Sequence, residues 1–387
     1  MAIQIEKNKC CGCMGCMNAC PKGAISVEKD SYGFLYPHVD QGKCIDCHLC
    51  EKVCGFVKED RKQSSPIKAY SLIHKNREVL LNSTSGGAFT ALSDMVLKQG
   101  GVIFGAYMNE QFDVMHVEAV DSGSRDSMRG SIYVQSYIGD TYSKVKNYLE
   151  QGRQVLFVGS PCQVGGLMSF LQKPYENLIG VEFLCHGVPN NYLFKAHIKF
   201  LEEKYSGKAK WYTFRSKKYA WWTHGIEEIT FEDGKQKASK AVQAYNSFFH
   251  SNVSLRPSCL NCTYRRIERA ADITIADFWG IEKITGKKNT TGVSMLFGNT
   301  DKGVSFIEAL DRNEAEISEV PFEKVKYRIA TKPAKPSRTP DDFWKLYRES
   351  GYQALVDKFT DTSLLGGGAL WIKKAIRKAF LGSKVNK

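Results

Sequence analysis

The sequence CCGCMGCMNAC at residues 10–20 has the same cysteine spacing as CIDCHLCEKVC at residues 44–54. Both stretches follow C-x2-C-x2-C-x3-C, with cysteines at Cys10, Cys13, Cys16 and Cys20 in the first and at Cys44, Cys47, Cys50 and Cys54 in the second. Because the whole spacing is duplicated, we expect the two stretches to fold together as one unit. These cysteines decide the fold of the N-terminal part of the chain.

The duplicated spacing is the ligand pattern of a bacterial two-cluster ferredoxin, in which the fourth cysteine of each run ligates the other cluster. It predicts two 4Fe-4S clusters, one held by Cys10, Cys13, Cys16 and Cys54 and the other by Cys44, Cys47, Cys50 and Cys20. Thiolates are the soft ligands that such clusters require. The alternatives fit less well, because a disulfide framework needs an exported chain and a zinc ribbon needs only paired C-x2-C knuckles.

The two cysteine loops differ in their glycines. Gly12 and Gly15 allow the first loop to adopt positive φ angles and to direct N–H groups at cluster sulfurs. Asp46 and Leu49 stand at the matching places of the second loop. We therefore expect the two clusters to differ in reduction potential.

Short segments of alternating apolar residues flank the cysteine runs, at residues 3–5 and 34–39. They predict strands of a duplicated β-α-β arrangement. We therefore expect an α+β ferredoxin-like module over residues 1–60. The charged and serine-rich segment at residues 58–66 then forms the linker to the rest of the chain.

Composition narrows the class of protein. A chain of 387 residues with 43% hydrophobic content is sufficient for two or three domains. An apolar run of membrane-spanning length and a signal peptide are both missing from the sequence, which predicts a cytoplasmic protein with reduced thiols. The net charge of +13 comes from scattered residues, which argues against nucleic-acid binding. A basic surface suits an acidic redox partner, an anionic substrate or a membrane face.

The rest of the chain alternates predicted strands with predicted helices. Strands are expected at residues 68–73, 102–107, 112–120, 155–158, 178–184, 211–214, 225–231, 272–276 and 293–297, and helices at residues 139–150, 164–171, 192–205 and 303–310. This order predicts an α/β body with a parallel or mixed sheet, divided into regions at residues 66–150 and 151–325. Ligands are expected at the carboxyl ends of the strands.

A hydroxyl- and glycine-rich segment, STSGGAFTAL at residues 83–92, opens a predicted helix after the first body strand. Helix N-termini and hydroxyl groups suit phosphate, so Ser83, Thr84 and Ser85 are candidate anion contacts. An ordinary N-cap with close helix packing is the alternative at this point.

Four further cysteines suggest a third site. Cys162 and Cys185 follow strands of adjacent β-α units, and Cys259 and Cys262 form a C-x2-C loop. Turns at one sheet edge converge in space, so these four thiols are candidates for a metal site. Zinc and buried unreactive thiols remain open alternatives. Cys11 lies out of register in the first run and is interpreted as a spare thiol.

Other side chains are candidates for chemistry at the same sheet edge. His186, beside Cys185, is a candidate proton donor, with a hydrogen-bonding scaffold role as the alternative. Trp221, Trp222 and His224 are candidates to cover a substrate pocket, or else ordinary core residues. Residues 326–387 are expected to form an extended linker and a basic amphipathic helix that contacts a membrane surface, a partner or the chain's own body.

Several motifs together resemble the coenzyme F420 hydrogenase/dehydrogenase beta-subunit family, preceded by a ferredoxin domain. They are STSGGAFTAL at residues 83–92, RGSIYVQS at 129–136, VLFVGSPCQVGGL at 155–167, LCHGVP at 184–189, RPSCLNC at 256–262 and ADITIADFWG at 271–280. The resemblance implies an FAD-containing iron–sulfur enzyme in which electrons pass between clusters and flavin, and the flavin exchanges a hydride with a small organic substrate.

The resemblance also implies which residues bind. The residues that it implies as FAD contacts are Ser83, Thr84, Ser85, Gly86, Gly87, Thr90, Ser131 and Tyr133. It also implies a third 4Fe-4S cluster, with ligands Cys162, Cys185, Cys259 and Cys262. A ferredoxin, or another subunit of a hydrogenase or dehydrogenase, is the implied electron partner. A non-catalytic electron-transfer subunit is the competing interpretation.

Three positions depart from the family pattern. Ile132 stands where the family has Lys, Ser160 where Thr is common, and Ala276 where Gly precedes the DFWG segment. Loss of a lysine beside a flavin would remove a cation that steadies a reduced, anionic ring. We therefore expect a changed substrate, or a site that accepts no deazaflavin.

Overall fold

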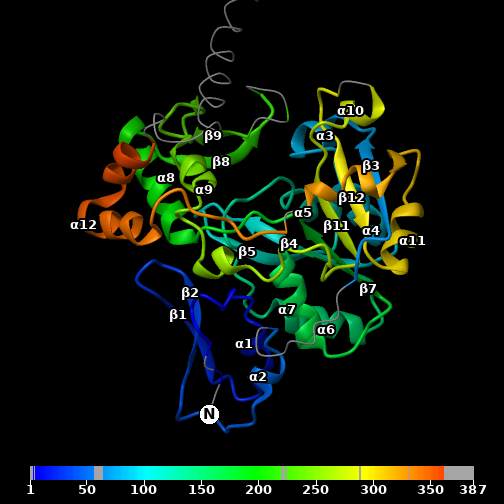
Figure 1. Ribbon diagram of the computed structural model, residues 1–387, viewed down its shortest axis with the longest axis horizontal. Coiled ribbons are helices and arrows are strands. Elements are labelled where there is room, and N and C mark those ends of the chain that lie inside the picture. Colours follow the sequence, from blue (N-terminus) through cyan, green and yellow to red (C-terminus); the bar gives the residue numbers. More distant parts are fainter. Residues whose placement is uncertain are drawn as a thin grey trace, which may run out of the picture.

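The computed structural model describes residues 3, 5–55, 64–218, 222, 225–286, 289–329 and 331–360. A small N-terminal module lies below a larger body in Figure 1, and the body has a sheet with helices and a second, smaller sheet beside it. The predicted linker at residues 58–66 lies mostly outside the described residues, and the basic tail lies wholly outside them. No helix among the described residues has the length and apolar character needed to cross a membrane.

The N-terminal module is built on a β-hairpin. Strand β1 (Ile25–Lys29) pairs antiparallel with β2 (Leu35–Val39), and the Asp30 carboxylate accepts hydrogen bonds from turn N–H groups. Helices α1 (Gly15–Ala19) and α2 (Leu49–Lys52) follow within the two cysteine runs. The strand expected at residues 34–39 is therefore confirmed.

The strand expected at residues 3–5 is not seen. Ile3 and Ile5 lie in no strand, and the residue between them is outside the described residues. Ile3 instead packs in a small apolar cluster with Ile25, which belongs to the hairpin. The hairpin partner is a segment between the two cysteine runs, so the module contains the expected α+β elements with a different first strand.

The body contains one mixed sheet of eight strands, in the order β13-β3-β12-β11-β7-β6-β4-β5. The strands are β3 (Lys68–His74), β4 (Val102–Met108), β5 (Val114–Ala119), β6 (Val155–Gly159), β7 (Leu178–Phe183), β11 (Ile273–Asp277), β12 (Ser294–Gly298) and β13 (Ala315–Val320). The pairs β4–β6, β6–β7 and β7–β11 are parallel and the others antiparallel. The predicted mixed α/β body is confirmed, and the predicted boundary at residue 150 falls within this sheet.

Helices cover both faces of the sheet. Side chains of α4 (Ala88–Lys98) and α11 (Asp301–Glu308) fill one core cluster. Side chains of α6 (Thr141–Glu150) and α7 (Pro161–Leu171) fill the opposite one. Successive residues of β4 alternate between these two clusters, as a strand buried on both faces requires. Short helices α3 (Arg77–Asn82), α5 (Ser122–Asp126) and α10 (Glu282–Thr285) complete this part.

A smaller sheet stands beside the main one. Strands β8 (Ala209–Ser216), β9 (Ile226–Phe231) and β10 (Gln236–Lys237) form it, and α8 (Asn191–Tyr205), α9 (Ala244–His250) and α12 (Pro340–Phe359) surround it. Their buried aromatic side chains share one core. Short 3-10 turns occur at η1 (Pro257–Asn261), η2 (Phe322–Lys324) and η3 (Lys326–Arg328).

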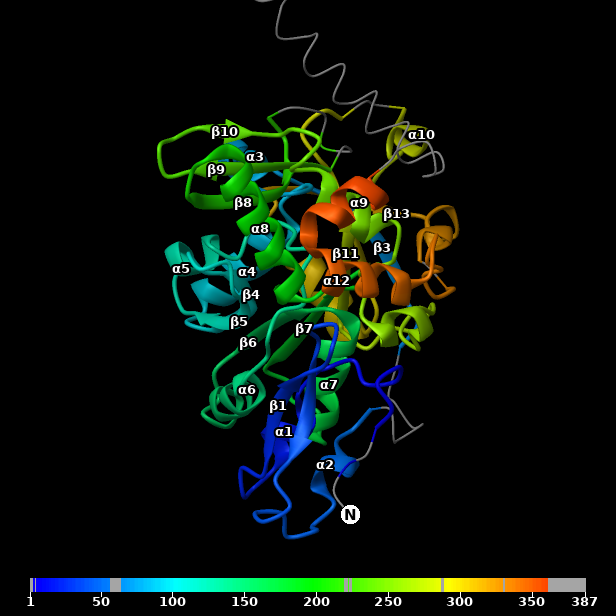
Figure 2. The same cartoon turned by 90° about the vertical axis from the view of Figure 1, so that its left-hand side faces the viewer.

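Helix α12 corrects the prediction for the C-terminal region. The prolines before it indicated an extended linker, but Pro340 occupies the first helical turn, where proline is favoured. Trp344 of this helix stacks on Tyr32 with 5.3 Å between ring centroids and meets the edge of Phe34 at 6.0 Å. The C-terminal helix therefore holds the β1–β2 hairpin against the body, as Figure 2 shows from the side.

Candidate iron–sulfur and cofactor-binding sites

The first site lies where the N-terminal module meets the body. Five cysteines, together with Ile3, Ile5 and Pro37, line one hollow: the predicted ligands Cys10, Cys13, Cys16 and Cys54, and also Cys11. The body side is formed by α7, which packs directly on α1. Met14, in the same loop, is buried in the core cluster beneath α6 and α7. The structure thus gathers the four cysteines that the spacing assigns to one cluster.

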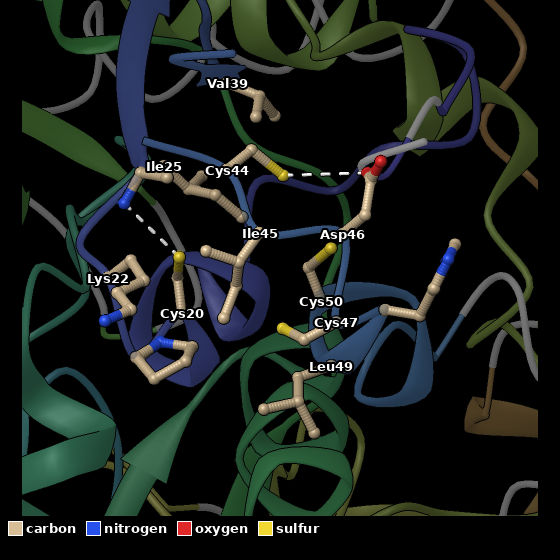
Figure 3. A pocket seen from close by; sticks show the side chains of 13 residues that line it. Cys20, Lys22, Ile25, Val39, Cys44, Ile45, Asp46, Cys47, Leu49 and Cys50 are labelled. Atoms are coloured by element: carbon tan, nitrogen blue, oxygen red, sulfur yellow. Dashed lines mark hydrogen bonds between the residues drawn. The ribbon is translucent and has the colours of Figure 1, made fainter. Parts of the chain in front are cut away.

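The second site lies at the far end of the module. Four cysteine side chains line it with Lys22 and Ile45: Cys20, Cys44, Cys47 and Cys50. Figure 3 shows their sulfurs around the same hollow, with the Cys20 sulfur accepting a hydrogen bond from the Ala24 N–H at 3.3 Å. Three cysteines of the second run thus meet the last cysteine of the first run, as the spacing predicts.

The two loops share a backbone conformation. Gly12 and Met14 have φ angles of 69° and 58°, and the matching Asp46 and His48 have φ angles of 50° and 57°. Gly15 does not adopt a positive φ, contrary to the prediction, because it begins α1. A Cβ there would lie 3.6 Å from the Gly166 carbonyl oxygen, which is an ordinary contact, so neither the backbone nor the packing requires glycine at this position. The duplicated spacing therefore folds into duplicated turns even where glycine is replaced.

Electrostatics at the first site acts in opposite directions on different thiols. Burial raises the pKa of Cys10 and of Cys16, while a hydrogen bond from Cys11 lowers the pKa of Cys13 to about 7. A bound metal centre would supply the positive charge that holds such buried thiols as thiolates. The donor set and its burial therefore fit a cluster.

The remaining four cysteines come together at the carboxyl ends of β6 and β7. Cys162 lies in the first turn of α7 and not in a preceding turn as predicted, because Pro161 and a Ser160–Gln163 capping box start the helix early. Burial, followed by repulsion from the thiols of Cys259, Cys162 and Cys262, raises the pKa of Cys185 well above its usual value. The four thiols are thus electrostatic neighbours.

The loops that carry these thiols are fixed to each other. The Arg256 N–H donates to the Val188 carbonyl at 2.9 Å, and the Cys259 N–H donates to the Arg256 carbonyl at 2.8 Å. Gly187 lies so close that a Cβ there would be 3.3 Å from the Cys259 Cβ. Burial raises the pKa of the Cys259 thiol to about 12. Among the described residues no group of three or more Cys, His, Asp or Glu is arranged to hold a single metal ion.

Cys11 lies between the first and third cysteine sets. It is buried, and its thiol hydrogen-bonds with both Cys13 and Cys162, which raises its pKa well above the usual value. Gly166, one turn after Cys162 on α7, lets Cys13 approach, since a Cβ there would lie 2.9 Å from the Cys13 sulfur. The interpretation of Cys11 as a spare thiol missed this position between two cysteine sets.

The STSGG segment packs on the edge of the sheet. The Gly86 N–H donates to the Ser294 hydroxyl at 2.9 Å and the Ser85 hydroxyl donates to the Val293 carbonyl at 2.6 Å. A Cβ at Gly86 would lie 2.2 Å from the Leu72 carbonyl oxygen, so only glycine fits. Gly87, with φ 86°, caps α4. At these residues the structure has the ordinary N-cap with close helix packing that was the alternative to anion binding.

The RGSIY segment lies beside the STSGG segment. The Ser131 N–H donates to the Thr84 hydroxyl at 2.8 Å, and the Arg129 Nε donates to the Thr90 hydroxyl at 3.1 Å. Lys217 reaches the same place from the end of β8 and donates to the Ser85 carbonyl at 2.9 Å. Two cations thus lie against residues that the sequence singled out. Neither periodicity nor a motif in the sequence pointed to Lys217.

Aromatic rings separate this region from the third cysteine set. Tyr133 stacks on Phe249 with centroids 4.6 Å apart, and Cys259 packs against the small apolar cluster of Phe249, Leu255 and Ala334. His186 lies 5.0 Å from the Phe249 ring, and its Nε2 is 2.6 Å from the Asn252 Oδ1. Burial lowers the pKa of His186, so a neutral, hydrogen-bonded ring is favoured. The proton-donor role of His186 stays a prediction.

Trp222 is an ordinary core residue. It is buried with Phe278 in one apolar cluster, and its Nε1 donates to the Asn289 carbonyl at 3.1 Å. Trp221 and His224, the other two candidates for covering a pocket, lie outside the described residues. Of the departures from the family pattern, Ile132 packs against the large aromatic core, and the Ser160 hydroxyl lies 3.2 Å from the Cys162 sulfur.

Two parts of the chain match known protein families. Residues 152–323 match the family described as the C terminus of the coenzyme F420 hydrogenase/dehydrogenase beta subunit, and residues 9–56 match the 4Fe-4S dicluster domain. The part of the chain at residues 152–323 therefore belongs to the beta-subunit family. The chain thus combines a region of an oxidoreductase family with an iron–sulfur dicluster domain near its N-terminus.

Individual relatives match shorter parts. An uncharacterized ferredoxin from Methanocaldococcus jannaschii is 38% identical over 56 residues, which is 14% of this chain and 71% of that protein. DNA-directed RNA polymerase subunit Rpo3 from Methanosarcina acetivorans is 35% identical over 103 residues, which is 27% of this chain and 33% of that protein. A solved chain of the F420-reducing NiFe hydrogenase complex from Methanosarcina barkeri is 17% identical, with a TM-score of 0.42, over 79% of this chain and 94% of that one.

Proposed function

We propose that this protein is an FAD-dependent iron–sulfur oxidoreductase that exchanges hydride with a small organic substrate. The observation that carries the proposal is the order of the sites. The third cysteine set adjoins the first through Cys11, and Cys259 packs against the apolar cluster that contains Phe249, on which Tyr133 stacks. Electron-carrying groups in this order would connect the N-terminal module to a cofactor in the body.

The residues around the two loops fit an anionic dinucleotide. Arg129 and Lys217 supply positive charge, and burial lowers the pKa of Lys217 to about 8, so that an anion beside it would favour its charged form. Thr84, Thr90 and Ser131 supply hydroxyl groups or N–H groups. A bound flavin would supply the exchange between single-electron and hydride chemistry. The proposed FAD contacts are therefore the eight residues that the family motifs indicate.

The chain's own residues have separable roles in this proposal. The cysteine sets would hold two clusters in the N-terminal module and a third at the body, and the half-buried Tyr133 ring, stacked on the buried Phe249, would help to exclude water beside the third set. The second cysteine loop, where Cys47 is exposed, would meet the electron partner protein. Neither nucleic acid nor a membrane surface is needed for this function.

One observation favours a second candidate, a non-catalytic electron-transfer subunit. The N–H groups of Gly86 and Ala88, which head helix α4, both point at the Ser294 hydroxyl. These donors are therefore engaged by the protein itself and not free for a phosphate group. In this case the clusters would pass electrons to another protein, and the body would bind no flavin.

Cofactor content separates the two candidates. Protein purified without oxygen should contain about twelve irons and one FAD per chain under the proposed function. About eight irons without FAD would overturn the enzyme and leave a two-cluster carrier. Zinc in place of the last four irons would assign the third site to a different metal.

A single variant tests the third site. Cys259→Ser should remove about four irons per chain and leave the paramagnetic signals of the N-terminal clusters unchanged. The matched control is Ser258→Ala, which alters the same 3-10 turn without removing a thiol. Unchanged iron in the cysteine variant would exclude a cluster at this set.

A further inference from the structure

Arg256 reaches from the body into the N-terminal module, and its charge is buried there. The residue is 1% exposed. Its Nε donates to the Cys10 carbonyl at 2.8 Å, and its Nη2 donates to the Leu35 carbonyl at 2.9 Å. The guanidinium lies over the Tyr36 ring, 4.3 Å from its centroid. The side chain thus spans both the first cysteine loop and the hairpin.

This buried cation has no carboxylate partner among the described residues. Its third contact, from Nη1 at 2.9 Å, is the neutral amide oxygen of Gln135. The other fully buried arginines differ, because Arg125 pairs with Asp94 and Asp126, and Arg269 pairs with Glu182. A charge removed from water normally requires an opposite charge beside it. The opposite charge for Arg256 must therefore come from a group other than Asp or Glu.

The cysteine sets surround this cation. The Nη2 of Arg256 is 3.9 Å from the Cys10 sulfur, and a Cβ at Gly12 would meet the guanidinium at 2.9 Å. The backbone of Arg256 is fixed to the third set, because its carbonyl accepts a hydrogen bond from the Cys259 N–H at 2.8 Å. In the sequence, Arg256 precedes Cys259 by three residues. The cation therefore stands between two proposed clusters.

We propose that Arg256 is the shared counter-cation of the first and third clusters and raises their reduction potentials above that of the second. This rests on the clusters of the proposed function. A 4Fe-4S centre with four thiolates carries roughly −2 when oxidised and gains a further negative charge on reduction. A buried cation stabilises the reduced form more, because charges interact strongly where water is excluded.

The second cluster site has no equivalent among the described residues. Lys22 lines that hollow, but its side chain is exposed, so water and salt screen its charge. Electrons that enter at the exposed second loop would therefore move toward higher potential as they pass inward. Arg256 would thus favour electron transfer from the exposed second loop toward the body.

The test is an EPR-monitored redox titration of the full-length protein with its clusters assembled. Arg256→Gln should lower the potential of the first cluster, so that at a fixed potential the reduced-to-oxidised ratio falls about tenfold, which is about 59 mV for a one-electron couple. A smaller fall is expected at the third cluster and none at the second. Arg256→Lys should restore most of the potential, and Lys22→Gln should leave the second cluster unchanged.

A second variant keeps the test decisive if Arg256→Gln assembles poorly. Gln135→Glu leaves the arginine in place and sets a carboxylate against it, so it should lower the first potential in the same direction. The double variant Cys47→Ser with Cys259→Ser isolates the first cluster and assigns its signal. Full iron with unchanged potentials in both Arg256→Gln and Gln135→Glu would overturn this inference alone. Absence of clusters from the unaltered protein would overturn the proposed function instead.

Discussion

The two cysteine loops have the same spacing and the same turns but opposite surroundings. Cys10 and Cys11 of the first loop are each 7% exposed and are covered by α7 and Arg256. In the second loop Cys47 is exposed, and the neighbouring Ile45 is 57% exposed. A duplicated sequence thus sets the geometry of two sites, while contacts from distant parts of the chain decide how each site behaves.

This difference suggests a division of tasks. An exposed loop with an uncovered apolar side chain suits brief contact with a partner protein, whereas a loop enclosed by the body suits transfer within the chain. The contrast between the loops would fail if changes in the first loop left the stability of the body unaffected. It would be strengthened if changes in the second loop affected only electron transfer with the partner protein.

The largest expected effect comes from removing one ligand at each loop. Cys13→Ser and Cys47→Ser should each lose about four irons per chain. Cys13→Ser should also lower the thermal midpoint more, because Cys13 packs against Gly166 of α7, whereas Cys47 is exposed. Iron analysis and calorimetry measure both effects. Equal thermal midpoints in the two variants would contradict the contrast between the loops.

The contact between the hairpin and α12 gives the next largest effect. Trp344 is 1% exposed and stacks on Tyr32. Trp344→Ala should therefore lower the free energy of unfolding by about 3–5 kcal/mol, as expected for a buried aromatic side chain. Trp211, which is 46% exposed, provides the control, and Trp211→Ala should change this free energy by about 0.5 kcal/mol or less. Denaturant titration distinguishes the two.

A smaller effect is expected at the contact between α7 and the first loop. Gly166→Ala places a methyl group 2.8 Å from the Cys13 Cβ and 2.9 Å from the Tyr142 hydroxyl, so the loop must shift. The change should cost about 1–3 kcal/mol and alter the magnetic interaction between the first and third clusters. Gly225→Ala is the control, because its new methyl group would have ordinary contact at 3.7 Å. A Gly166 variant with wild-type stability and spectra would show that the loop is not held by α7.

Local patterns in the sequence predicted the parts that depend on neighbours in the chain. Cysteine spacing indicated both ligand sets in the module, and short apolar runs indicated strands such as β4 and β6, because each signal is contained in a few consecutive residues. The sequence did not indicate β13 or the pairing of β1 with β2. Those pairings depend on which distant segment supplies the matching edge.

The same reason explains what was missed at the sites. Arg256 contacts the carbonyl oxygens of Cys10 and Leu35. Because every residue has a backbone carbonyl, the sequence does not indicate which ones a distant arginine will contact. Gly166 was one glycine of a motif until the structure set Cys13 against it. Cys162 was expected in the turn between a strand and a helix, but Pro161 suits the first turn of a helix, which therefore begins before Cys162.

The smallest expected effect is a pH dependence that separates a buried histidine from an exposed one. His197 is enclosed by Tyr212 and Tyr352, and burial lowers its pKa to about 3. Because the folded pKa lies below the unfolded value near 6.5, the unfolded state binds more protons between these values. Stability should therefore fall as pH drops below about 6.5, with a slope of up to about 1.4 kcal/mol per pH unit from this residue.

Replacing the histidine tests that slope. His197→Gln should flatten the decline of unfolding free energy between about pH 6.5 and pH 4, even though it lowers stability at neutral pH by removing a contact with Tyr352. His48 of the second cysteine loop is exposed and lies 2.9 Å from Glu51, and His48→Gln is the matched replacement at an exposed position. An equal effect of both replacements would mean that the enclosed core around α8 and α12 is as open to protons as the exposed loop.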